Sequence, residues 1–167
     1  MAPSYRPNVC TVLIDPPTGR VLVFRRVDAA LGADVWQFPQ GGVRSGESPG
    51  EAVLRELEEE IGTARVEILA QSPRPIRYTF PPEVLEKLAR SQPDKRGYVG
   101  QEQTWFLATL IEGETSIHFG HKPAEFDAYR WVTPGEALAA AVPFKREAYR
   151  EGLGALGLLD QERPEET

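Results

Sequence analysis

Cysteine, histidine and methionine are nearly absent from this chain of 167 residues. It has one cysteine, two histidines and one methionine. A single cysteine excludes an intrachain disulfide and fits a reducing compartment, and so few cysteine and histidine ligands exclude an ordinary zinc site. No apolar run approaches the roughly 20 residues of a membrane span, and the first residues lack the apolar stretch of a signal peptide. We therefore expect a cytoplasmic protein with no membrane partner.

The composition is that of a folded domain with a local excess of acid. Hydrophobic residues make up 41% of the chain and charged residues 26%, which is typical of globular proteins. The formal net charge of −6 divides into −4 within residues 41–63 and −2 within residues 161–167, and the remainder is neutral. The acidity therefore indicates one local feature and a tail, and does not argue against a nucleic-acid partner.

Runs of β-branched residues alternate with turn residues and helix signals, which predicts a single α/β domain with helices covering a mixed sheet. The first two strands are expected to form a hairpin. We expect the domain to span residues 1–160, followed by a disordered tail at 161–167. The predicted strands cover 8–14, 20–27, 36–38, 65–71, 76–80, 103–111 and 126–132. The predicted helices cover 49–61, 82–89, 134–142 and 144–158.

The helix predicted at 49–61 has complete boundary signals. Ser48 is a preferred N-cap, Pro49 takes the first helical position, and Glu51 is placed to complete a capping box. Gly62 is placed to end the helix. A helical wheel predicts a core face made of Val53, Leu54, Leu57 and Ile61.

Three glutamates, Glu56, Glu59 and Glu60, share another side of this helix at positions i, i+3 and i+4. Like charges at this spacing repel, and the helix dipole disfavours anions in the last turn. A divalent cation would convert the repulsion into ligation, and carboxylate oxygens suit Mg²⁺ or Mn²⁺. A solvated acidic face is the alternative, which the helix taken alone favours.

The residues that flank the helix favour the metal site. The chain reads Gly41, five residues, Glu47, seven residues, Arg55-Glu56-Leu57, one residue, Glu59-Glu60, one residue, Gly62. This string resembles the signature of the Nudix hydrolases, which cleave a nucleoside diphosphate linked to another group. It departs from that signature at Thr63, where the family has an aliphatic residue. The resemblance implies a loop–helix–loop that binds divalent cations.

The resemblance also implies roles for the helix residues. Glu56, Glu59 and Glu60 would ligate the metal, and Arg55 would orient the metal-binding carboxylates. Either Glu56 or Glu59 would accept the proton of a metal-activated water. The sequence leaves that choice open.

The likeness extends over most of residues 5–150 to one branch of the family. That branch comprises the bacterial RNA 5′-pyrophosphohydrolases, also described as dinucleoside polyphosphate hydrolases. The matching segments are 5–9, 36–42, 100–106, 125–127, 130–132 and 144–146. The loop at 27–35 looks longer than is usual in the branch, and the match fades past Tyr149.

Several site residues outside the helix follow from these resemblances. Gly41 and Gly42 would let the loop backbone approach the metal and phosphates, Glu47 would be structural, and Glu125 would join the metal site from a distance.

Four further residues would bind substrate. A cation neutralises phosphate and an aromatic face stacks on a base. The resemblance assigns such roles to Arg6, Arg26, Phe144 and Lys145. Core packing is the alternative for Phe144, and a solvated strand end is the alternative for Arg26.

The implied reaction is Mg²⁺-dependent hydrolysis of a phosphoanhydride at the 5′-triphosphate end of RNA, with Mn²⁺ as a substitute ion. It would give 5′-monophosphate RNA and pyrophosphate or phosphate. A dinucleoside polyphosphate such as diadenosine tetraphosphate is the alternative substrate, because it also offers a base, a ribose and a polyphosphate. A non-catalytic nucleotide or RNA sensor is a second alternative, disfavoured because every metal-ligating glutamate of the signature is present. A monomer is favoured.

Overall fold

The computed structural model describes residues 4–27, 34–91, 97–120 and 124–159. In these residues eight strands form one mixed sheet, whose main path runs β3-β2-β1-β7-β5. The strands are β1 Ser4–Asp15, β2 Arg20–Arg26, β3 Trp36–Gln37, β4 Gln40–Gly42, β5 Val66–Gln71, β6 Ile76–Thr79, β7 Tyr98–Leu110 and β8 Phe126–Val132. The helices are α1 Pro49–Ile61, α2 Pro82–Ser91, α3 Pro134–Ala140 and α4 Arg146–Ala155, with short 3₁₀ turns at Glu114–Ser116 and Pro143–Lys145.

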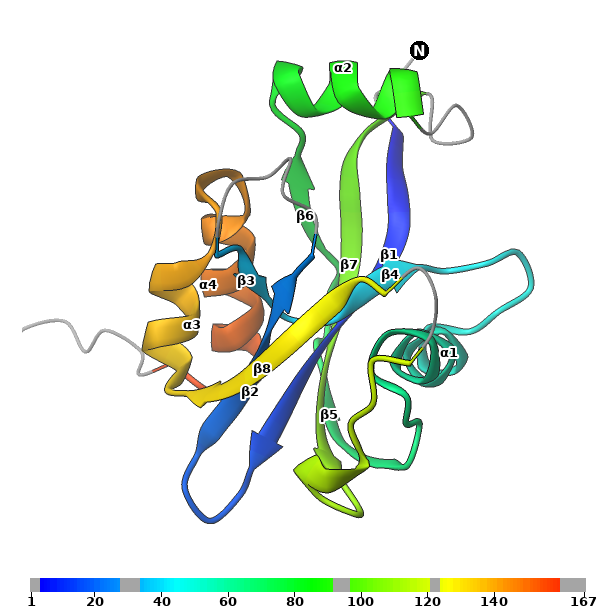
Figure 1. Cartoon of the computed structure of the whole chain (residues 1–167). Coiled ribbons are helices and arrows are strands. Elements are labelled where there is room, and N and C mark those ends of the chain that lie inside the picture. Colours follow the sequence, from blue (N-terminus) through cyan, green and yellow to red (C-terminus); the bar gives the residue numbers. More distant parts are fainter. Residues whose placement is uncertain (1–3, 28–33, 92–96, 121–123, 160–167) are drawn as a thin grey trace, which may run out of the picture.

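A long parallel pairing of β1 with β7 forms the centre of the sheet. The predicted β1–β2 hairpin is confirmed, and β4, β6 and β8 pair antiparallel with β1, β7 and β2. Helix α1 lies on one side of the sheet and α3 with α4 on the other, while α2 stands beyond the far ends of the strands (Figure 1). The predicted α/β class is confirmed. Among the described residues, no helix has the length and apolar character needed to cross a membrane.

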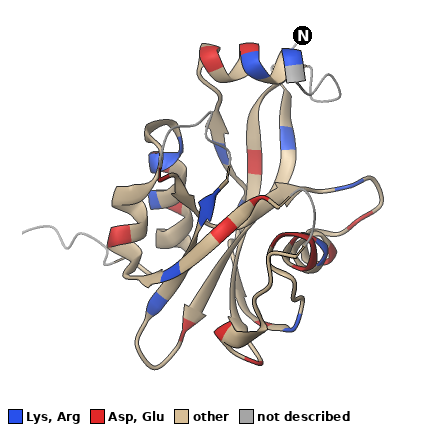
Figure 2. Cartoon of the chain, viewed as in Figure 1, with Lys and Arg blue, Asp and Glu red and all other residues tan. Residues whose placement is uncertain are grey.

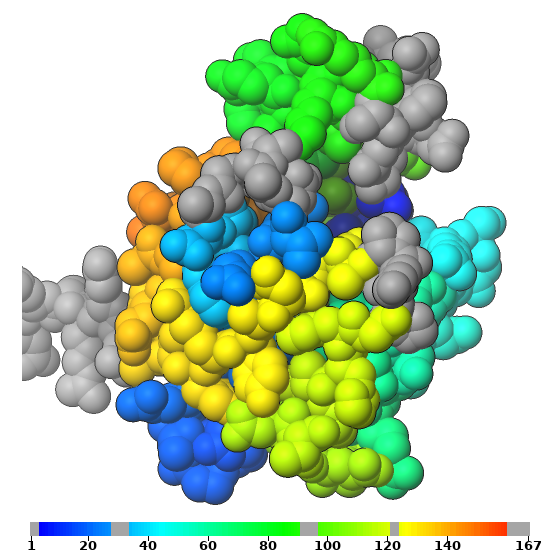
Figure 3. All heavy atoms as spheres, viewed as in Figure 1, coloured from blue at the N-terminus to red at the C-terminus, as the bar shows by residue number. Residues whose placement is uncertain are grey.

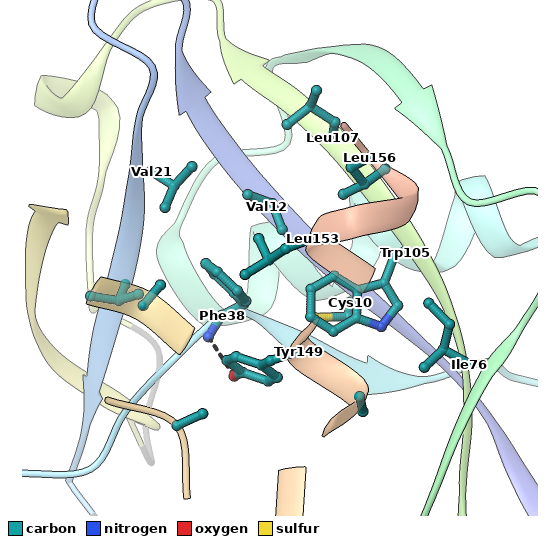
Figure 4. Packing of buried hydrophobic residues seen from close by; sticks show 14 of the residues in the cluster. Cys10, Val12, Val21, Phe38, Ile76, Trp105, Leu107, Tyr149, Leu153 and Leu156 are labelled. Carbon is teal, nitrogen blue, oxygen red and sulfur yellow. Dashed lines mark hydrogen bonds between the residues drawn. The ribbon is translucent and has the colours of Figure 1, made fainter. Parts of the chain in front are cut away.

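The core beneath α3 and α4 is built around aromatic rings. Trp105 of β7 is fully buried and meets Phe38 and Tyr149 edge-on, with ring centroids 5.8 and 5.4 Å away. The Tyr149 hydroxyl accepts a hydrogen bond from the backbone N–H of Phe38 at 3.1 Å (Figure 4). A Cβ on Gly152 would lie 2.2 Å from the Trp105 ring, so a glycine there lets α4 approach the sheet closely. This packing fixes α4 and the 3₁₀ turn that precedes it.

The predicted core face of α1 is correct except at Leu54. Val53, Leu57 and Ile61 are fully buried, whereas Leu54 is 39% exposed and Ala52 is buried in its place. At 100° per residue the buried arc runs from Ala52 through Val53 to Ile61 and ends just short of Leu54. The small Ala52 side chain lets this edge of the helix lie close to the sheet.

Other differences arise at element boundaries. The strand predicted at 8–14 begins at Ser4, because its first residues pair with the start of β7. Gly41 and Gly42, expected in a loop, pair with β1 as part of β4. The helix predicted at 144–158 is a 3₁₀ turn followed by the shorter α4. The expected tail at 161–167 and most of the 27–35 loop lie outside the described residues.

Candidate active site

A cavity of about 500 Å³ opens between α1, β4 and α2, a volume typical of small-molecule sites. Figure 3 shows the surface hollowed below α2, with atoms of β1 in dark blue at depth. Eight of the ten predicted site residues line it, namely Arg6, Arg26, Gly41, Glu56, Glu60, Glu125, Phe144 and Lys145. Arg55 and Glu59 lie outside the lining. Residues up to 139 positions apart in the sequence (Arg6 and Lys145) thus line one cavity.

Helix α1 is held at both ends as the sequence predicts. The Ser48 hydroxyl accepts a hydrogen bond from the Glu51 backbone N–H at 3.2 Å, and the Ser48 N–H donates to the Glu51 carboxylate at 3.4 Å. Gly62 ends the helix with φ 79°, a left-handed conformation that favours glycine. These caps fix the residues at which α1 begins and ends. Figure 2 shows acidic residues gathered on this helix.

Arg55 connects the loop before α1 to the helix. Its Nε and Nη2 donate to both carboxylate oxygens of Glu47, at 2.7 and 2.8 Å, and Nη2 also donates to the Gly42 carbonyl at 2.7 Å. Nη1 donates to Glu56 at 2.7 Å and to Glu59 at 3.4 Å. The hydrogen bonds from Arg55 lower the pKa of Glu47 to about 2. Arg55 is therefore placed to orient Glu56, and Glu47 to hold Arg55.

Three carboxylates face one another where α1 meets the start of β8. Burial raises the pKa of Glu60 well above its usual range, and the charges of Glu125 and Glu56 raise it further. Burial also raises the pKa of Glu56, against the opposing effect of Arg55. Glu125 reaches this place because β8 pairs with β2, where its carbonyl accepts a hydrogen bond from the Val27 N–H at 3.0 Å.

This donor set fits a hard divalent cation. Glu60 is 6% exposed, and among the described residues its Oε2 has no hydrogen-bond partner. A buried carboxylate oxygen without a donor, beside two further carboxylates, is a costly arrangement that a cation relieves. In the described part of the chain no three acidic, histidine or cysteine side chains are already grouped as a complete ligand set. Binding would therefore draw these side chains together.

Glu59 lies at the edge of this arrangement. Its side chain is 48% exposed, and its carboxylate oxygens lie 3.5 Å from Arg44 Nη2 and 3.4 Å from Arg55 Nη1. The i, i+4 pair Glu56 and Glu60 turns inward, whereas Glu59 would have to rotate to reach a cation. Its predicted role as a ligand stays a prediction.

The two glycines of β4 lie directly against charged side chains. A Cβ on Gly41 would come within 2.0 Å of Cδ of Glu56, and a Cβ on Gly42 would come within 2.0 Å of Nη2 of Arg6. Any larger residue would displace the carboxylate or the guanidinium. Close approach is thus the physical reason for glycine here.

The opposite wall of the cavity is basic and aromatic. Lys145 is 9% exposed, and burial, followed by the nearby charge of Arg26, lowers its pKa to about 8. Its Nζ lies 5.9 Å from the ring centroids of both Phe144 and Tyr78. Phe144 also packs against the hydrophobic core, so both interpretations of this residue have structural support.

Several other residues that the sequence did not predict also line the cavity. Tyr78 alternates with exposed neighbours along β6, a pattern that could have placed it on an inner face. Val84 and Leu88 share one side of the helix predicted at 82–89, a pattern that could have placed them on an inner face. Gln101 carried no signal, because its position depends on how β6, α2 and β7 pack together. The missed lining residues include Tyr78, Phe80, Val84, Lys87, Leu88 and Gln101.

Comparisons with known proteins identify the family to which this chain is similar. The NUDIX domain model matches residues 4–152. The RNA pyrophosphohydrolase of Saccharophagus degradans is 42% identical over 158 residues, which cover 93% of this chain and 87% of that protein. The RNA pyrophosphohydrolase of Helicobacter pylori is 43% identical over 151 residues, 89% of this chain and 90% of that protein.

Two solved structures show the same fold at low sequence identity. The E. coli dihydroneopterin triphosphate pyrophosphohydrolase has a TM-score of 0.63 and 21% identity, covering 88% of this chain and 95% of its own. The C. elegans Ap4A hydrolase has a TM-score of 0.58 and 17% identity, covering 90% of this chain and 98% of its own. Together with the family match, these findings show that the chain belongs to the Nudix hydrolase family, whose members generally use divalent metal ions.

Proposed function

We propose that this protein is a Mg²⁺-dependent hydrolase that converts the 5′-triphosphate end of RNA to a 5′-monophosphate. The observation that carries the proposal is a single cavity that joins two opposite kinds of charge. Its carboxylates are Glu56, Glu60 and Glu125, and its cations include Arg6, Arg26 and Lys145. A polyphosphate needs both, because cations bind its oxygens directly and carboxylates bind it through metal ions. The RNA pyrophosphohydrolase relatives, about 42% identical over most of the chain, support this substrate.

Glu56, Glu60 and Glu125 would hold the cation, with Glu59 joining after rotation. The bound metal supplies charge neutralisation and a more acidic water. Arg55 keeps the Glu56 carboxylate in place through its 2.7 Å hydrogen bond. Glu56 or Glu59 takes the proton as the water oxygen bonds to phosphorus and a phosphoanhydride P–O bond breaks. Cleavage between the α- and β-phosphates releases pyrophosphate and leaves 5′-monophosphate RNA in one step. Release of phosphate reaches the same product through 5′-diphosphate RNA and a second hydrolysis.

The cationic wall assists at the phosphates. Arg6 lies over Gly42, beside the glutamates. Lys145 lines the cavity from the 3₁₀ turn Pro143–Lys145, which directly precedes α4 and its buried residue Tyr149. Preorganised cations in a partly dry site stabilise charge that develops on the leaving phosphates. These residues would bind substrate without taking part in proton transfer.

The test is to incubate the protein and Mg²⁺ with 5′-triphosphate RNA and, in parallel, with diadenosine tetraphosphate. We expect faster turnover of the RNA. The variant Glu59→Gln should lose metal-dependent hydrolysis, whereas Glu58→Gln, an exposed glutamate on the same helix, should not. Full activity of Glu59→Gln would remove Glu59 from the mechanism.

The same experiment decides between the remaining alternatives. Faster turnover of diadenosine tetraphosphate would identify a dinucleoside polyphosphate hydrolase. Turnover of neither substrate, with binding of both retained, would identify a nucleotide or RNA sensor and overturn the proposal.

A further inference from the structure

Helix α2 forms a wall of the cavity that has no part in the metal and phosphate binding proposed above. It connects β6 to β7 and stands over the hollow, at the top of the molecule in Figures 1 and 3. Val84 and Leu88 lie one helical turn apart, are half-buried and line the cavity. The exposed Lys87 lines its rim. Glu86 and Arg90 form an ion pair on α2 and are absent from the lining.

The α2 end of the cavity differs in chemistry from the carboxylate end. Val84 and Leu88 present aliphatic groups, and Phe80 and Tyr98 add aromatic ones. The floor carries one buried acceptor, since Gln101 is 8% exposed and its Oε1 has no hydrogen-bond partner within the described residues. A buried acceptor left without a donor costs free energy that a bound donor recovers.

A phosphate chain does not complement this surface. It is charged, so it does not favour aliphatic contacts, and it carries only acceptors, so it cannot donate a hydrogen bond to Gln101. A nucleoside matches the surface. The faces of a base are flat and apolar, and its edge and ribose carry N–H and O–H donors. Aliphatic contact with a base face would also be tolerant of base identity, as stacking contacts are.

We propose that α2 and Gln101 form the subsite for the nucleoside next to the polyphosphate, with Val84 and Leu88 against the base and Gln101 Oε1 accepting a hydrogen bond. The inference rests on the proposed function, because it takes the phosphates to lie on the glutamates. Val84, Leu88 and Gln101 are then substrate-binding residues that act on substrate affinity and leave the chemical step unchanged.

The first test compares two double variants of α2 in Mg²⁺-dependent hydrolysis of a short 5′-triphosphate RNA. Val84→Ala with Leu88→Ala should raise KM about 10-fold with kcat unchanged. Glu86→Ala with Arg90→Ala, on the other side of the helix, should keep the wild-type KM. An unchanged KM in the first pair would overturn the inference while leaving the proposed function intact. Absence of hydrolysis by the wild type would instead overturn the proposed function.

The second test uses unaltered protein, so it does not depend on how the variants fold. Isotope-labelled methyl groups of Val84 and Leu88 should shift in NMR spectra on adding a non-hydrolysable nucleoside triphosphate. Inorganic tripolyphosphate, which has the phosphates without the nucleoside, should leave them in place. Equal responses to both ligands, or to neither, would contradict a nucleoside subsite at α2.

Discussion

Arg55 holds both oxygens of Glu47, through Nε at 2.7 Å and Nη2 at 2.8 Å. The pair joins the loop before α1 to the helix and leaves Nη1 free of Glu47, so that it donates to Glu56 at 2.7 Å. The i, i+4 contact of Arg55 with Glu59, which the helix spacing suggests, is longer at 3.4 Å. Bidentate geometry is the stronger arrangement, so Glu47 sets the orientation of the guanidinium.

Glu47→Gln should lower activity although Glu47 is absent from the cavity lining. The amide accepts one hydrogen bond from Arg55 in place of two, which loosens the guanidinium and with it Glu56. Loss of a partner that orients a metal ligand costs about 10- to 100-fold in activity, measured as kcat/KM on 5′-triphosphate RNA. Glu58→Gln serves as the control for loss of one charge in this region. Equal kcat/KM in both variants would contradict the orienting role of Glu47.

Glu60→Gln should raise the stability of the metal-free protein and weaken the binding of Mg²⁺. The buried Glu60 carboxylate faces Glu56 and Glu125, so removing its charge relieves repulsion in the metal-free protein and should raise its melting temperature. Wild-type protein should gain about 2.7 kcal/mol at a Mg²⁺ concentration 100 times the dissociation constant, and the variant should lose most of this gain. Thermal unfolding with and without Mg²⁺ measures both effects. An undiminished Mg²⁺ effect in the variant would exclude Glu60 as a ligand.

Gly41→Ala should impair the site with little effect on the fold. The new Cβ would lie 2.0 Å from Glu56 Cδ, so the carboxylate must move away from its bond with Arg55. The control is Gly50→Ala on α1, where no atom lies within 4 Å of the added Cβ and stability should rise by about 0.4–1 kcal/mol. Both variants are compared by Mg²⁺ titration and by kcat/KM. Normal Mg²⁺ affinity in Gly41→Ala would show that Glu56 does not depend on the close approach.

Lys145 should impose a fall in kcat/KM as the pH rises through about 8. Burial lowers its pKa to about 8, so the free enzyme loses the ammonium charge above that pH and binds phosphate less well. The pH profile of kcat/KM reports groups of the free enzyme. Lys145→Arg keeps its charge throughout and should shift the fall to higher pH. An identical inflection near pH 8 in Lys145→Arg would assign it to another group.

The sequence by itself determined α1 and predicted which of its residues form the site. Ser48, Glu51 and Gly62 act within one or two helical turns, so local spacing is enough to set the boundaries at Pro49 and Ile61. The alternation of strands and helices likewise determined the α/β class. The family signature predicted Glu56 and Glu60 as site residues from the sequence alone, because it is contained in one contiguous segment.

Tertiary structure alone decided which groups share the cavity. Glu60 is buried and Glu59 exposed although they are adjacent, because packing of Ala52 and Val53 on the sheet sets the rotation of α1. The resemblance suggested Glu125, but its position beside α1 depends on the pairing of β8 with β2. The nucleoside wall proposed on α2 depends on where the β6–β7 connection stands. Such contacts join residues far apart in the chain and form only when the whole fold packs. Local spacing in the sequence therefore does not show which of these residues will meet.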